Sequence, residues 1–83
     1  NRRAHFYNNA ASALFHKGES ARMRGWMEKT RQHQKALFKE AVGFYTDAIL
    51  TIDQAIAIAP NNGSYQKSRK DFVDLKEELK PFL

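Results

Sequence analysis

The stretch FKEAVGFYTDAILTIDQAIAIAP, residues 38 to 60, carries more apolar side chains than one neighbouring helix could cover. The alternation AIAIA near its end is typical of a strand, yet it continues a helical repeat with steps of three and four residues. The pattern therefore favours a helix. All seven residues of this repeat are apolar: Phe38, Ala41, Tyr45, Ala48, Ile52, Ala55 and Ala59.

A second apolar stripe, formed by Val42, Ile49 and Ile56, widens the apolar arc of this helix to roughly 160° at about 100° per residue. Since an arc this wide serves two neighbours, we expect residues 36 to 59 to form the central helix of a bundle. A membrane span would need about 20 mostly apolar residues. The run contains four charged residues, which argue against a membrane span: Lys39, Glu40, Asp47 and Asp53.

The two expected neighbours flank the central helix in the sequence. The pattern predicts helices at about 4 to 27, 30 to 59 and 64 to 80, with small residues prominent in the first. The polar segment from 19 to 35 reads as a helical extension or a partly ordered loop. We thus expect a single all-α domain over residues 1 to 83, an antiparallel three-helix bundle with an extended first helix or inter-helix segment.

The net charge of +5 is concentrated in one part of the chain. Up to Lys35 there are eight Lys or Arg against two Glu, whereas the remainder has six basic and seven acidic residues. A solvated face is the simplest explanation, but a basic surface can also anchor a protein on an anionic membrane or nucleic acid. The candidate residues for such an anchor are Arg22, Arg24, Lys29, Arg31 and Lys35.

The sequence offers little chemistry for catalysis. There is no cysteine, the three histidines are dispersed, and no metal-binding or phosphate-binding motif is present. We therefore expect neither an enzyme nor a bound cofactor or metal.

Two stretches resemble the microtubule-interacting and trafficking (MIT) domain family. KEAVGFYTDAILTIDQAI at 39 to 56 is similar to the family's second helix, with an acidic residue before Ala, then Tyr, then Ala followed by an aliphatic residue. DFVDLKEELKPFL at 71 to 83 is similar to its third helix, with an aromatic-aliphatic-Asp triplet followed by Glu and a Leu-Lys pair. AASALFHKGES at 10 to 20 resembles the end of its first helix more weakly.

This resemblance implies a three-helix module that binds C-terminal tails of ESCRT filament subunits and recruits its parent protein to membrane-trafficking sites. Such a module would be cytoplasmic, at the periphery of endosomal or other trafficking membranes. The family's main groove lies between the second and third helices. On the third helix, Val73 falls outside the expected core arc and has charged neighbours, as a helix-in-groove site requires. The expected peptide-binding residues are Arg69, Val73, Lys76, Glu77 and Lys80.

The chain departs from the family pattern at two places. Lys76 stands where the family usually keeps alanine on the groove side, and the segment from Glu19 to Lys35 is longer than the family's common turn. Trp26 in that segment, with Met23 and Met27 nearby, is expected to cap the bundle, or else to meet a membrane. A helical interaction or dimerisation domain similar to a tetratricopeptide repeat is a further alternative. We expect a monomer, with nucleic acid the less favoured partner.

Overall fold

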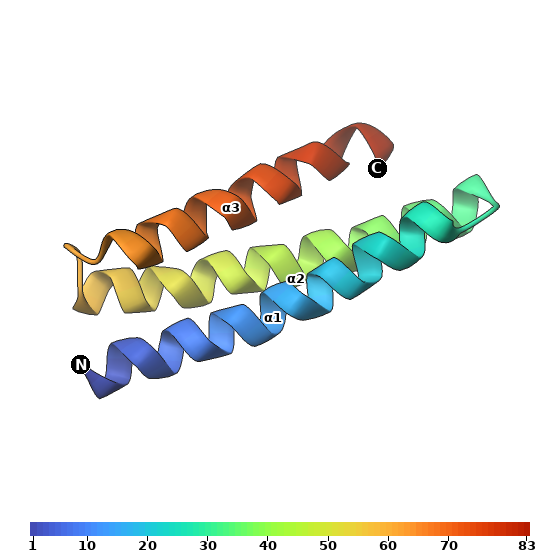
Figure 1. Cartoon of the computed structure of the whole chain (residues 1–83). Helices are drawn as coiled ribbons and strands as arrows, with labels where there is room; N and C mark the ends of the chain where they lie inside the picture. The colour runs from blue at the N-terminus through green and yellow to red at the C-terminus, as the bar shows by residue number, and fades with distance from the viewer.

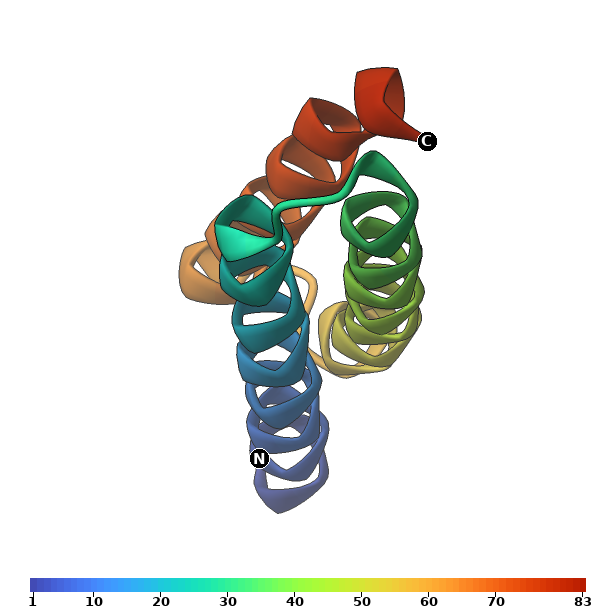
Figure 2. The same cartoon turned by 90° about the vertical axis from the view of Figure 1, so that its right-hand side faces the viewer.

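The computed structural model describes all 83 residues as three helices: α1 (Arg2–Met27), α2 (Arg31–Ile58) and α3 (Gly63–Leu79), followed by a 3-10 turn, η1 (Lys80–Phe82). Consecutive helices are antiparallel and form an elongated bundle of 45 × 19 × 14 Å (Figure 1). Seen from its end, the bundle has the three helices at the corners of a triangle (Figure 2). The expected all-α antiparallel three-helix bundle is thus confirmed, with helix ends no more than two residues from the predicted ones.

Small residues on α1 pack against large residues on α2 at heptad spacing. Every seventh residue of α1 from Ala4 to Gly25 is buried and is alanine or glycine, while Phe38, Tyr45 and Ile52 are buried at the same spacing on α2. The two series interlock, since a Cβ added to Gly18 would lie only 2.7 Å from the Tyr45 ring. The small side chains therefore allow the two helix backbones to approach closely.

The core confirms the apolar repeat predicted for α2. All of its members from Phe38 to Ala55 are fully buried, and only Ala59, at the C-cap, is half-buried. From α3, Tyr65, Phe72 and Leu79 complete the core. The contact between α1 and α3 includes Phe15 and Phe72, which stack with ring centroids 4.7 Å apart.

The polar segment from 19 to 35 is a helical extension on both sides of a short turn. α1 continues to Met27 and α2 begins at Arg31, so the long inter-helix segment that we considered is wrong. The turn closes with local hydrogen bonds: the Thr30 hydroxyl accepts from the His33 amide at 3.3 Å, and the Gly25 carbonyl accepts from the Gln34 side chain at 3.2 Å. These bonds satisfy polar groups left free at the two helix ends.

α2 is long and apolar enough, by length and composition, to cross a membrane. The four charged residues therefore do not exclude a membrane span by composition alone, as we had argued from the sequence. In this fold the apolar stripes of α2 lie against α1 and α3, and the core helix of a bundle has the same composition for that reason.

Candidate functional site

The edge of α3 that carries the predicted peptide-binding residues borders α2. Arg69 fixes this relation, because its Nε lies 2.7 Å from Oδ1 of Asp53 on α2. Val73 and Lys76 follow on the same edge at helical spacing, and both are half-buried. The structure thus places these three residues along the junction of α2 and α3.

The other two predicted residues, Glu77 and Lys80, lie toward the C-terminal end of the same edge and are exposed. They form an ion pair with each other, with Lys80 Nζ 2.9 Å from Glu77 Oε1. An exposed pair of this kind adds little stability. All five residues therefore share one stripe of α3, although Val73 is less exposed than we expected.

On the α2 side of this junction, sequence reasoning missed Leu50. Its side chain is 61% exposed, which is unusual for a leucine in the middle of a core helix. Because α2 and α3 are antiparallel, one turn along α3 from Arg69 to Val73 corresponds to one turn back along α2, from Asp53 to the level of Leu50. At about 100° per residue, Leu50 lies about 80° outside the predicted apolar arc, so the sequence pattern placed it on the exposed side of α2.

We call this surface the α2–α3 edge and define it by its members: Leu50, Asp53, Arg69, Val73, Lys76, Glu77 and Lys80. These members comprise two aliphatic side chains, three basic groups and two acidic groups. Both acidic groups are already paired with a basic one, whereas Lys76 has no ion-pair partner. The edge is therefore slightly positive, with one cation free to meet a partner.

A polar network joins α1 to α2 near the middle of the bundle. The Tyr45 hydroxyl donates a hydrogen bond to Oε1 of Glu19. Arg22 binds the same carboxylate with two N–H groups, Nη2 to Oε2 at 2.8 Å and Nε to Oε1 at 3.2 Å. No buried side-chain nitrogen or oxygen in the protein lacks a partner, so this network is complete without a ligand.

The network shifts the pKa values of its members. Burial raises the pKa of Tyr45 above its ordinary value, and the hydrogen bond to Glu19 raises it further, so the phenol stays protonated at neutral pH. Burial would raise the pKa of Glu19, but hydrogen bonds from Arg22 and Tyr45 outweigh this effect and leave it below 4.5. A protonated phenol beside a paired carboxylate is suited to holding two helices together rather than to attacking a substrate.

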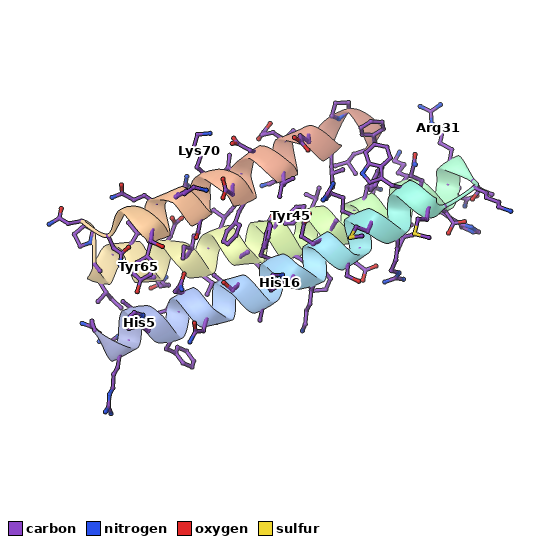
Figure 3. All side chains as sticks on the ribbon, in the orientation of Figure 1. His5, His16, Arg31, Tyr45, Tyr65 and Lys70 are labelled. Carbon is purple, nitrogen blue, oxygen red and sulfur yellow. The ribbon has the colours of Figure 1, made fainter.

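The predicted basic surface divides into two parts. Arg22 belongs to the network with Glu19 and is half-buried. The other four are exposed and form no ion pair: Arg24, Lys29, Arg31 and Lys35. They lie near the turn between α1 and α2, where Arg31 projects away from the ribbon (Figure 3). The structure thus groups four of the five predicted residues around the end of the hairpin.

Trp26 caps this end of the bundle, as we expected. Its ring meets Phe38 edge to face at 4.9 Å and Phe82 at 5.0 Å between centroids. The ring nevertheless remains 49% exposed, with Met23 and Met27 more exposed still. Capping therefore leaves part of this apolar surface in water.

The remaining surface has few features of a catalytic site. One open hollow lies at the start of α1, lined by Arg2, Arg3, Phe6 and Tyr7. No group of three or more histidine, cysteine, aspartate or glutamate side chains is placed to hold a metal ion.

Comparison with known proteins gives no match: no protein-family model, no curated protein and no solved structure is similar enough to this chain to be assigned to it. The resemblance to MIT domains therefore rests on the sequence motifs alone.

Proposed function

We propose that this chain is a protein-interaction module that binds a short peptide segment of a partner along the α2–α3 edge. The observation that carries the proposal is that exposed Leu50 on α2 and half-buried Val73 on α3 lie at similar heights, next to the Arg69–Asp53 ion pair that joins the two helices. Apolar anchors within a charged rim are what an amphipathic peptide needs for binding.

The resemblance to MIT domains supports C-terminal tails of ESCRT filament subunits as the partner. Binding of such tails would recruit the parent protein to membrane-trafficking sites in the cytoplasm, at endosomal or other membranes. The slightly positive rim favours tails with acidic residues beside their apolar anchors, because the free Lys76 ammonium can pair with a peptide carboxylate.

A panel of labelled ESCRT tail peptides titrated into the protein tests this proposal at about 0.15 M salt. We expect micromolar binding by at least one tail, on the order of −8 kcal/mol or weaker. Leu50→Asp and Val73→Asp should each weaken that binding at least tenfold, because a carboxylate would replace an apolar anchor.

Ala13→Asp is the matched control, since it places the same carboxylate on an exposed position of α1. Thermal unfolding of each variant separates lost binding from lost folding, which matters most for half-buried Val73. The proposal is wrong if folded Leu50→Asp and Val73→Asp bind tails as the unchanged protein does, or if no tail binds.

Lys76→Ala distinguishes two forms of the bound peptide. Lys76 is half-buried at the junction, so its bulk holds a peptide helix away from α3, while its charge attracts an acidic segment. A helical tail should bind Lys76→Ala equally well or better, whereas an extended acidic tail should bind it more weakly. Unchanged or tighter binding to Lys76→Ala would indicate the helical mode.

A further inference from the structure

The end of the α1–α2 hairpin combines exposed apolar side chains with unpaired basic ones. Met23, Trp26 and Met27 recur at steps of three and one along the last turns of α1 and are 60%, 49% and 81% exposed. Four exposed basic residues without ion pairs belong to the same end of the hairpin, on the last turn of α1, in the connecting turn and on the first turns of α2: Arg24, Lys29, Arg31 and Lys35. We call these seven residues the hairpin tip.

Residues 23 to 39, after Arg22 with its Glu19 partner, contain five Lys or Arg and a single acid, Glu28, a balance of +4 against a net charge of +5 for the whole chain. Glu28 is itself engaged, since its Oε1 accepts from the Lys29 amide at 3.2 Å and lies 3.7 Å from His33 Nδ1. Arg31 also occupies the first turn of α2, where acidic side chains would stabilise the helix better. Internal stability therefore does not account for the positive charge at this place.

The apolar part of the hairpin tip is likewise left without a partner. α1 buries Gly18, Ala21 and Gly25 against the bundle, while Met23 and Met27 lie on its outer side. The α1–α2 hairpin extends beyond the end of α3 (Figure 1). Met23 and Met27 both remain largely exposed. Exposed apolar side chains beside free cations are typical of protein segments that lie in the membrane interface.

We propose that the hairpin tip docks this protein on an anionic phospholipid surface. The methionine side chains enter the boundary between headgroups and acyl chains, and the four cations contact lipid phosphate and carboxylate groups. Nucleic acid suits the same charges less well. Its bases bind by stacking on open aromatic faces, whereas Trp26, the only tryptophan, is packed against Phe38 and Phe82.

Vesicle binding tests the proposal directly, with Trp26 as a reporter inside the hairpin tip. Vesicles of phosphatidylcholine with phosphatidylserine should bind the protein, shift Trp26 emission to the blue and shield it from an aqueous quencher. Vesicles of phosphatidylcholine alone should do so far less, and rising salt should weaken the binding.

Two variants separate charge from apolar contact. Arg24→Gln/Arg31→Gln/Lys35→Gln should lower vesicle affinity by about fivefold for each charge removed, or about 100-fold in all. The control Lys17→Gln/Lys67→Gln/Lys70→Gln loses the same charge from exposed positions elsewhere and should bind nearly as the unchanged protein does. Met23→Ser/Met27→Ser should reduce binding about tenfold or more and abolish the blue shift of Trp26.

Three results would overturn the proposal. The first is an equal loss of binding in the two charge variants, and the second is vesicle binding without any change in Trp26 emission. The third is tighter binding to a DNA or RNA oligonucleotide than to the anionic vesicles at the same salt concentration. Leu50→Ser should leave vesicle binding unchanged, so failure here and failure of peptide binding on the α2–α3 edge can be told apart.

Discussion

The side chain of Tyr45 is buried in the core, yet its hydroxyl reaches Glu19 on the neighbouring helix. Removing this hydroxyl leaves the ring packing intact and takes one donor from the carboxylate. We expect Tyr45→Phe to lower the free energy of unfolding by about 1 to 2 kcal/mol, as measured by urea denaturation. Tyr7→Phe is the control, because the half-buried Tyr7 makes no side-chain hydrogen bond that the change would remove. An equal effect of the two changes would contradict this role of Tyr45.

The same network makes stability depend on acid. Since the pKa of Glu19 is below 4.5 in the folded protein, the unfolded chain binds a proton more readily there. The stabilisation is therefore present above the unfolded pKa and is lost as pH falls through the folded one. We expect Glu19→Gln to lower the free energy of unfolding at neutral pH and to flatten its fall below about pH 4.5. Glu40→Gln, at an exposed position without an ion pair, should leave that slope nearly unchanged.

The contact between Glu19 and Tyr45 shows where sequence reasoning ends at the scale of residues. The apolar repeat identified Tyr45 as a core residue, and burial confirms it. Its polar partner lies 26 residues away, on another helix. This pairing depends on the position of α1 along α2. The residue pattern within one helix does not determine that position. Leu50 was missed because it lies outside the apolar arc of α2, where a pattern within one helix gives it no role.

At the scale of the helices, a crowded glycine and an open one allow helix packing to be tested by two alanine substitutions. A Cβ on Gly25 would lie 2.5 Å from the ring of fully buried Phe38, whereas a Cβ on Gly43 would meet nothing within 4 Å. We expect Gly25→Ala to destabilise by about 1 to 3 kcal/mol through overpacking. Gly43→Ala should stabilise by up to about 1 kcal/mol, because alanine is the better helix former.

Thermal and urea unfolding of the two variants measure these opposite signs. The same sign for both would show that helix propensity alone decides the effect, and that α1 does not pack closely on α2 at Gly25. The sequence alone does not distinguish the two positions, because the contact at Gly25 comes from a residue of another helix.

The helices themselves could be predicted because apolar residues recur with one period over most of the chain. The segment from 19 to 35 was harder, since its core positions are occupied by Ala21 and Gly25, which carry little apolar signal. Thr30, as an N-cap residue, was the local indication of a new helix. The role of the small residues of α1 is clear only from the structure, in which they pack against the large residues of α2.

For the whole molecule, α3 is the element that both completes the core and forms half of the candidate site. The stripes of α2 predicted two neighbours, and α1 and α3 occupy those places. The residue pattern of α3 alone did not determine which side of this helix borders α2. The ion pair between Arg69 and Asp53 settles that orientation. This ion pair places the predicted residues of α3 beside Asp53 of α2, one turn from Leu50.

Removal of α3 tests whether the three helices depend on one another. A chain ending at Asn62 would expose the stripe of α2 formed by Val42, Ile49 and Ile56, and would lose the core side chains Tyr65, Phe72 and Leu79. Because α1 cannot cover both stripes, we expect this fragment to lose its cooperative thermal transition or to associate through the exposed stripe. A separate peptide of residues 63 to 83 added to the fragment should restore the transition. A fragment that unfolds cooperatively as a monomer in sedimentation would show that α1 and α2 form an independent hairpin, with α3 only an addition to it.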